Sequence, residues 1–258
     1  MRDRQIQSPN HPSRQSPSAL LLDLDDTILD DSSSVHDSWR DACAIHADRL
    51  APLDAAIVTD AIRKTSKWFW DDPDRHREGR LQLEAARREV VRLALKDLGI
   101  DDTDLAACIG DAYSHRRDLG MAPLPDAIDT VRWLRESGRR LALLTNGAGI
   151  AQRKKIVRFE LADLFDVILV EGELGFGKPD ERVYQRALSA LDVEPADAWM
   201  VGDNLDWDVG APQKLGMAGV WIDARGRGVP EQSAVKPDYI VRALADLRGL
   251  IGNVALSR

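Results

Sequence analysis

The sequence predicts an α/β fold, in which a Rossmann-like parallel sheet carries an all-helical cap inserted after its first strand. Three observations support this class. Short apolar runs alternate with helical periodicity through the second half of the chain. One similar apolar run stands alone near the start, and the long stretch between them has only helical periodicity. Strands that alternate with helices form βαβ units, which build a parallel sheet covered on both faces.

The first expected strand is the apolar run Ala19–Leu22, which ends abruptly at Asp23. A short, continuous apolar run is typical of a parallel strand that is buried on both faces. Residues 1–17, which precede it, are rich in Ser, Pro, Gln and Arg. This composition buries little apolar surface, so we expect a disordered tail.

The helical cap is expected over residues 32–119, as about four helices. Leu83, Val90, Val91 and Leu98 belong to an apolar pattern with spacings of three and four, and arginines occupy the opposite face. The consecutive aromatics at 68–70 cannot all face one side of a helix. Packing inside the cap is favoured for them, and stacking on a substrate ring stays open.

Five more strands are expected after Pro123 and Pro125. They are Arg140–Thr145, Val167–Val170, Ala198–Gly202, Gly219–Asp223 and Tyr239–Arg242, with helical patterns near Asp126–Ser137, Ile150–Glu160, Glu181–Leu191 and Asp208–Leu215. The expected sheet domain therefore comprises residues 18–31 and 120–258. Because open parallel sheets bind ligands at the carboxyl ends of their strands, residues directly after each strand are the candidate site residues.

Composition excludes several classes of protein. Of the 258 residues, 44% are hydrophobic and 30% charged, which is ordinary for a globular chain. The formal net charge of −8 argues against a general nucleic-acid binder. Cys43 and Cys108 fit neither a disulfide framework nor a zinc motif and predict reduced thiols in a cytoplasmic protein. We expect neither a signal peptide nor a membrane anchor, because no apolar run is long enough.

Two carboxylates follow the first expected strand. Asp23 and Asp25 lie two residues apart, and crowded carboxylates require a proton or a cation between them. Mg²⁺ is a suitable cation because it prefers oxygen ligands. Asp23 is the candidate nucleophile toward phosphorus, and Asp25 is the candidate general acid and base. Taken alone, the pair is more typical of an acidic turn that follows a strand.

Complementary groups follow the next two expected strands. Thr145 and Asn146 offer a hydroxyl and an amide just before a helix, whose free N–H groups attract anions. Lys178 lies in a glycine-rich loop and is the candidate to neutralise phosphoryl oxygens and keep the nucleophile ionised. A helix cap and a solvated loop lysine are the ordinary alternatives.

A second acidic cluster follows Ala198–Gly202. Asp203 is the candidate third carboxylate on the metal, whereas Asp206 is expected to face solvent. Asp208 is expected to orient Lys178 or Asn204, which makes Asp208 and Asn204 supporting residues. Four complementary groups after four successive strands are hard to obtain by chance. Together they predict a site that handles a phosphoryl group with a divalent cation.

Four segments carry a resemblance to a known family. They are LLLDLDDTILD, LLTNG, GKPD and MVGDNLDWD, beginning at residues 20, 143, 177 and 200. Together they resemble the motifs of the haloacid dehalogenase-like hydrolase superfamily, in its phosphatase branch with a type-one helical cap. The resemblance implies a Rossmann-like core that uses Mg²⁺.

The resemblance also implies roles for single residues. Asp23 matches the nucleophile and metal ligand, and Asp25 the general acid and base, which also binds the metal through its backbone carbonyl. Thr145 and Asn146 match the phosphate-binding pair, with Lys178 as the lysine of the third motif. Asp203 matches the remaining metal ligand, and Asp208 its supporting acid.

One position separates the branches of the superfamily. The resemblance implies that true dehalogenases carry a tyrosine, rather than an aspartate, two residues after the nucleophile. A halide leaving group needs no proton, so these enzymes do not need an acid at this position. Asp25 therefore favours a phosphatase acting on a small phosphorylated metabolite, such as a nucleotide, sugar or sugar-acid phosphate. A phosphomutase or a 2-haloacid dehalogenase on the same core is the alternative, and a scaffold without activity ranks lower. The expected partner is a small phosphate ester, with neither nucleic acid nor membrane; the oligomeric state is left open.

Overall fold

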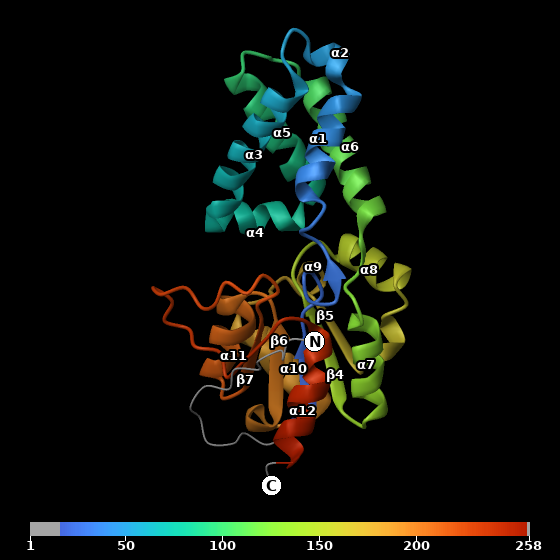
Figure 1. Ribbon diagram of the computed structural model, residues 1–258, viewed down its shortest axis with the longest axis vertical. Helices are drawn as coiled ribbons and strands as arrows, with labels where there is room; N and C mark the ends of the chain where they lie inside the picture. Colours follow the sequence, from blue (N-terminus) through green and yellow to red (C-terminus); the bar gives the residue numbers. More distant parts are fainter. Residues whose placement is uncertain (1–15, 257–258) are drawn as a thin grey trace. The chain divides into compact units, whose positions relative to one another are not determined.

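The computed structural model describes residues 16–256, and the chain divides into two compact units (Figure 1). The sheet unit joins the residues up to Asp30 to those from Pro123 onward, and the helical unit is Asp31–Ala122. Most of the expected disordered tail, residues 1–15, lies outside the described residues. Where the chain passes between the units, β2 (Leu29–Asp30) and β3 (Ala122–Pro123) form a small two-stranded sheet.

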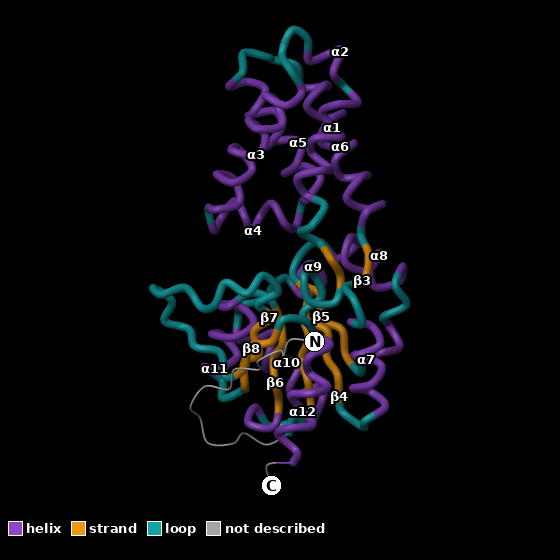
Figure 2. The backbone as a smooth tube through the Cα atoms, in the orientation of Figure 1, coloured by secondary structure: helices purple, strands orange, loops and turns teal. Residues whose placement is uncertain are grey.

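The sheet unit confirms the predicted parallel sheet. Its strands are β1 (Ala19–Leu22), β4 (Arg140–Thr145), β5 (Val167–Val170), β6 (Ala198–Gly202), β7 (Ala218–Ile222) and β8 (Tyr239–Val241). They pair in parallel in the order β5-β4-β1-β6-β7-β8, and Figure 2 shows them as neighbouring orange segments. The first four expected strands have the observed bounds, and the last two end one residue early.

Helices cover both faces of this sheet. On one face, α10 (Glu181–Leu191) and α11 (Ala211–Lys214) pack against apolar residues of the strands. In Figure 1, α12 (Leu247–Leu256) lies in front of the sheet and α10 behind it, while α7 (Ala127–Glu136) packs against β4. All four residues of β1 are fully buried, which explains its unbroken apolar sequence.

The topology fixes where a site can form. β1 is central, with β4 on one side and β6 on the other, so the chain reverses its direction of winding at β1. The register pairs Leu22 with Leu143 and with Val201, which brings the carboxyl ends of these strands to one edge. Crevices outside such a reversal point are where open α/β sheets bind ligands.

The helical unit consists of six helices rather than the expected four. They are α1 (Val35–Ile45), α2 (Ala47–Leu50), α3 (Ala55–Asp71), α4 (Pro73–Leu81), α5 (Leu83–Asp97) and α6 (Thr103–Gly120). The prediction missed breaks that local caps create. Asp72 accepts a hydrogen bond from the Arg75 N–H, and Pro73 is the first residue of α4.

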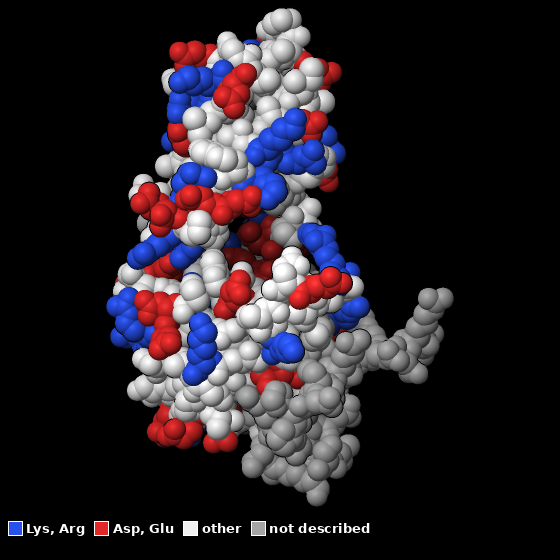
Figure 3. Space-filling model, turned by 90° about the vertical axis from the view of Figure 1, so that its left-hand side faces the viewer, with Lys and Arg blue, Asp and Glu red and all other residues white. Residues whose placement is uncertain are grey.

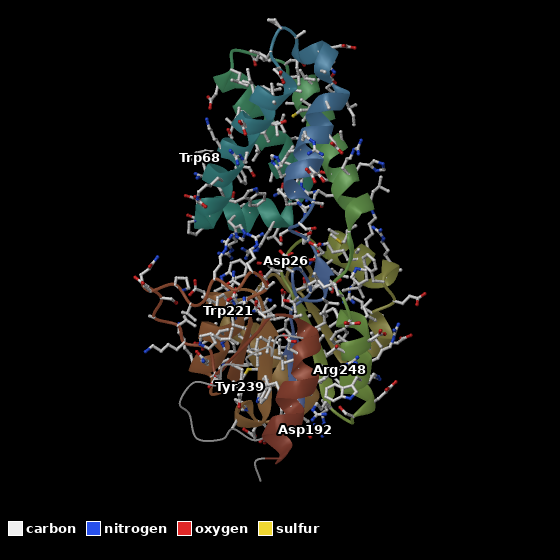
Figure 4. All side chains as sticks on the ribbon, in the orientation of Figure 1. Asp26, Trp68, Asp192, Trp221, Tyr239 and Arg248 are labelled. Carbon is white, nitrogen blue, oxygen red and sulfur yellow. The ribbon has the colours of Figure 1, made fainter. Side chains whose placement is uncertain are left out.

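The core of the helical unit explains most of its aromatic residues. Trp39 stacks on Tyr113 with ring centroids 3.5 Å apart, and Phe69 is buried. Trp68 is 53% exposed on α3 (Figure 4), where the Arg75 guanidinium lies 3.8 Å from its ring centroid. The three consecutive aromatics thus divide between core and surface, as helical spacing requires.

Charged residues of both signs are interspersed on the visible face of the helical unit (Figure 3). Several form ion pairs within a helix or between neighbouring helices, such as Arg92 with Glu89 and Arg88 with Asp111. Within residues 16–256, no helix combines the length and apolar character that crossing a bilayer requires.

Candidate active site

A buried lysine joins two carboxylates at the carboxyl edge of the sheet. Lys178 Nζ lies 2.6 Å from Asp23 Oδ1 and 2.7 Å from Asp208 Oδ1. The three residues are at most 7% exposed. Asp23 follows β1 directly, and its N–H donates to Val201 O of β6, so the nucleophile candidate continues the sheet pairing beyond the end of β1.

The titration of this triad follows from its burial. Removal from water raises the pKa of Asp23; Lys178 lowers it, Asp208 raises it, and the result is about 6. Burial alone favours neutral Lys178, but the carboxylates of Asp208 and Asp23 hold its pKa above the ordinary value. Lys178 is therefore a fixed positive charge beside the candidate nucleophile.

The Asn146 side chain holds the backbone of Lys178 in place. Asn146 Oδ1 accepts from the Lys178 N–H at 2.9 Å, and Asn146 Nδ2 donates to Lys178 O at 2.6 Å. A Cβ at Gly177 would lie 2.5 Å from Asn146 Oδ1, so this close approach requires glycine. Because both ends of the amide are engaged, the side chain of Asn146 supports the backbone of Lys178.

The loop after β6 supplies the supporting carboxylate. Asp208 is fully buried; besides contacting Lys178, it accepts from the Asn204 N–H at 3.0 Å through Oδ2. Asn204 in turn caps η3 (Leu205–Gly210) by accepting from the N–H groups of Asp206 and Trp207. The helix expected at Asp208–Leu215 is therefore a π-helical turn followed by α11. Such turns occur often at functional sites.

Two of the predicted metal ligands, Asp23 and Asp203, belong to an acidic cluster. Carboxylate oxygens of Asp23, Asp203 and Asp208 lie within 4.8 Å of one another. Partial removal from water, followed by repulsion from Asp23 and Asp208, raises the pKa of Asp203 to about 8. The side chain of Asp203 is exposed, so a cation could reach it. A bound cation would relieve the repulsion among the three carboxylates. The oxygen donors and their excess negative charge fit Mg²⁺.

The Asp25 carboxylate has different partners from this cluster. Its oxygens lie 2.7 and 2.8 Å from Lys155 Nζ, and Oδ2 also accepts from Gln152 Nε2 at 2.9 Å. Both partners belong to α8 (Gly149–Arg158), the helix that begins just after the Thr145–Gly147 loop. Gln152 Nε2 also donates to Thr145 Oγ1. The structure thus brings Asp25 and Thr145 together through Gln152.

Sequence reasoning missed four residues of this edge. Gln152 and Lys155 contact Asp25, Thr27 Oγ1 donates to Asp23 Oδ2 at 3.3 Å, and buried Glu171 accepts from the Gly147 N–H at 2.9 Å. One signal was available for Gln152. It lies four residues before Ile156, so the helical pattern places an amide on a buried face. Asp206, expected to face solvent, is exposed.

Comparison with known proteins decides the family. The model of the haloacid dehalogenase-like hydrolases matches residues 17–216. The chain belongs to this family. Family membership accounts for the order of the four strand-end motifs and confirms the resemblance that the sequence carries.

Two curated relatives and one solved structure illustrate the range of this hydrolase family. The chain is 34% identical to a phosphoserine phosphatase of Thermus thermophilus over 88% of this chain and 96% of the relative. It is 28% identical to a glyceraldehyde 3-phosphate phosphatase of Methanopyrus kandleri over 92% and 98% of the respective chains. The crystal structure of a 2-haloacid dehalogenase from Pseudomonas syringae pv. Tomato matches with a TM-score of 0.60 at 27% identity, covering 91% of this chain and 98% of that one.

Proposed function

We propose that this hydrolase is a phosphatase that cleaves small phosphate monoesters through an aspartyl-phosphate on Asp23. The presence of Asp25 carries the proposal, because an alkoxide leaving group needs a proton and this carboxyl group can supply one. The phosphoserine and glyceraldehyde 3-phosphate phosphatases among the relatives support it. Both act on small esters of this kind, as their names state.

In the first half of the reaction, a carboxylate oxygen of Asp23 attacks phosphorus and forms an O–P bond. The bond between phosphorus and the ester oxygen breaks, and the ester oxygen takes a proton from Asp25. Lys178 compensates negative charge on the phosphoryl oxygens and on Asp23. Thr145 Oγ1 accepts from Gln152, so its own hydrogen remains for donation to a phosphoryl oxygen.

In the second half, water attacks the phosphorus of the aspartyl-phosphate and gives a proton to Asp25. The O–P bond to Asp23 breaks, which releases inorganic phosphate and restores both carboxyl groups. Mg²⁺ held by Asp23 and Asp203, with the backbone carbonyl of Asp25, would supply positive charge to the phosphoryl group when bound. Asp208 holds Lys178 in place throughout.

We further propose that the helical unit, Asp31–Ala122, is the cap that chooses among substrates, since the sheet unit accounts only for phosphoryl chemistry. Cys43 and Cys108 are both free, which supports a cytoplasmic location. A small phosphate ester is the proposed partner. Neither nucleic acid nor a membrane surface is expected.

Two other reactions remain as alternatives on the same core. The similarity to a 2-haloacid dehalogenase at 27% identity favours halide release, but Asp25 has no task in that reaction. A phosphomutase would pass the phosphoryl group from Asp23 to a second hydroxyl instead of to water. Inorganic phosphate, an isomeric ester or halide as the product distinguishes the three reactions.

The deciding experiment measures phosphate release from a panel of phosphorylated metabolites, with Mg²⁺ and with a chelator. We expect release that requires Mg²⁺ and is abolished in Asp23→Asn, while the circular dichroism of that variant is unchanged. Phosphate release by folded Asp23→Asn at the wild-type rate would exclude the aspartyl-phosphate. Halide release from a 2-haloacid, without phosphate release from any ester, would favour the dehalogenase.

A further inference from the structure

Helix α8 presents two polar side chains to the edge of the sheet. Gln152 is 3% exposed and Lys155 is half-buried, and they lie three residues apart on one side of α8. Neither belongs to the motif residues that the sequence singled out. Keeping an amide and an ammonium in partly dry surroundings is costly unless each has a specific partner.

Both side chains point their N–H groups at Asp25. Lys155 Nζ lies within 2.8 Å of both carboxylate oxygens, and Gln152 Nε2 lies 2.9 Å from Oδ2. Charge-assisted contacts of this kind are shorter and stronger than neutral hydrogen bonds. Three contacts from one rigid helix therefore define the place of a carboxylate that would otherwise rotate about two side-chain bonds.

The charges at this edge explain why such a restraint is required. Asp23, Asp203 and Asp208 gather around Lys178, and repulsion from them pushes a further carboxylate away. Lys155 attracts Asp25 toward α8 and Thr145 instead. The two lysines thus separate the carboxylate that bonds to phosphorus from the carboxyl group that handles the proton.

We infer that Lys155 and Gln152 are positioning residues that hold the Asp25 carboxyl group in place for proton transfer to the leaving oxygen. The inference rests on the proposed phosphatase function. A proton passes efficiently only across hydrogen-bond distance, and a misplacement of about 1 Å can cost on the order of 10²-fold in rate. Gln152, which also contacts Thr145, ties this carboxyl group to the proposed phosphoryl-binding hydroxyl.

The test exploits the leaving group. Phosphoserine releases an alkoxide that needs the proton, whereas p-nitrophenyl phosphate releases a phenolate that is stable without it. For Lys155→Met we expect kcat on phosphoserine, or on the best alkyl phosphate of the panel, to fall on the order of 10²-fold. On p-nitrophenyl phosphate, kcat should change little, and KM should stay near the wild-type value for both esters.

Five further variants complete the experiment. Lys154→Met removes an exposed lysine of the same helix and is the matched control, expected to behave as wild type. Gln152→Leu should show the same selective loss, and Lys155→Arg should restore part of the alkyl phosphate activity. In Asp25→Asn, which itself shows the selective loss, adding Lys155→Met should cost nothing more, because the two residues act through one proton transfer.

The possible outcomes distinguish a failure of this inference from a failure of the proposed phosphatase function. Equal losses on both esters in Lys155→Met would show a general structural role and overturn the inference. Wild-type rates on the alkyl phosphate would overturn it as well. If the wild-type protein released phosphate from no ester, the proposed function itself would fail.

Discussion

Ion pairs of equal length occupy opposite environments in the two units. In the helical unit, Arg88 Nε lies 2.6 Å from Asp111 Oδ1, with both side chains about half exposed. In the sheet unit, Lys178 Nζ lies 2.6 Å from Asp23 Oδ1, with side chains 3% and 10% exposed. The N–O distance alone does not show which pair contributes more to the stability of the fold. Water screens the first pair, whereas losing one partner of the second leaves a buried charge uncompensated.

The two kinds of pair also differ in how they arise along the chain. Glu89 and Arg92 pair within one helical turn, so local sequence suffices to form the contact. Asp23 and Lys178 are 155 residues apart and meet only because β1 and the loop after β5 reach the same edge. The fold therefore places deeply buried ion pairs where the chemistry is proposed. Three predictions test this contrast.

The largest effect is expected for Lys178→Met. Without the ammonium, Asp23 and Asp208 face each other in a buried site, and breaking such a pair costs about 3–5 kcal/mol. The free energy of unfolding, measured by urea denaturation at neutral pH, should fall by that order. Phosphate release should be lost with it. The exposed Lys154→Met is the control; a Lys178→Met protein as stable as this control would contradict the contrast.

A second effect links pH, stability and Mg²⁺. The pKa values of Asp23 and Asp203 are raised to about 6 and about 8, against roughly 4 in an unfolded chain. Between these values the native state binds more protons than the unfolded state. The free energy of unfolding of the metal-free protein should therefore fall as pH rises from about 4 to about 8.

Mg²⁺ competes with these protons, so it should raise the melting temperature more at pH 8 than at pH 5. At a hundredfold excess over Kd, saturation stabilises by about 2.7 kcal/mol. Thermal melts with Mg²⁺ and with chelator check this difference. In Asp203→Asn, most of this difference between the Mg²⁺-induced shifts at the two pH values should be lost. An equal Mg²⁺ shift at both pH values would argue against binding at these carboxylates.

The smallest effect is expected in the helical unit. A double-mutant cycle on Arg88→Ala and Asp111→Ala should give a coupling free energy within the error of urea denaturation at physiological ionic strength. Both partners stay hydrated in the single variants, so neither becomes a buried, unpaired charge. A coupling free energy as large as the loss of stability in Lys178→Met would show that exposure to water does not determine how much an ion pair contributes to stability.

The sequence was informative where local pattern and structure coincide. The runs at 19–22, 140–145, 167–170 and 198–202 are strands with those bounds. The strands at 19–22 and 198–202 are buried along their whole length, which explains their unbroken apolar sequence. The strand ends then located Asp23, Lys178 and Asp208, which the structure brings into contact. Parallel topology alone sufficed to predict that they share an edge.

Interactions that depend on three-dimensional packing were not predictable in this way. Lys155 lies in a run of basic residues on α8; helical spacing places it on the side of Gln152 but does not indicate that it contacts Asp25. The amide of Asn146 was predicted to bind phosphate because a strand-end amide is a good donor, and its contacts with the Lys178 backbone were not foreseen. Similarly, Asp25 was predicted to bind the metal through its backbone carbonyl, and the contacts of its side chain with α8 were not foreseen.

The pairing of Asn146 with Lys178 has an evolutionary consequence. A carboxamide has the same donor and acceptor as a peptide group. Directly after β4, the Asn146 side chain therefore pairs with the Lys178 backbone as a neighbouring strand would. Aspartate has the shape but no N–H, and serine is too short to reach both atoms of Lys178. Under selection for the buried lysine, position 146 should therefore accept almost no substitution. A substitution at position 146 should occur together with changes in the glycine-rich loop that contains Lys178.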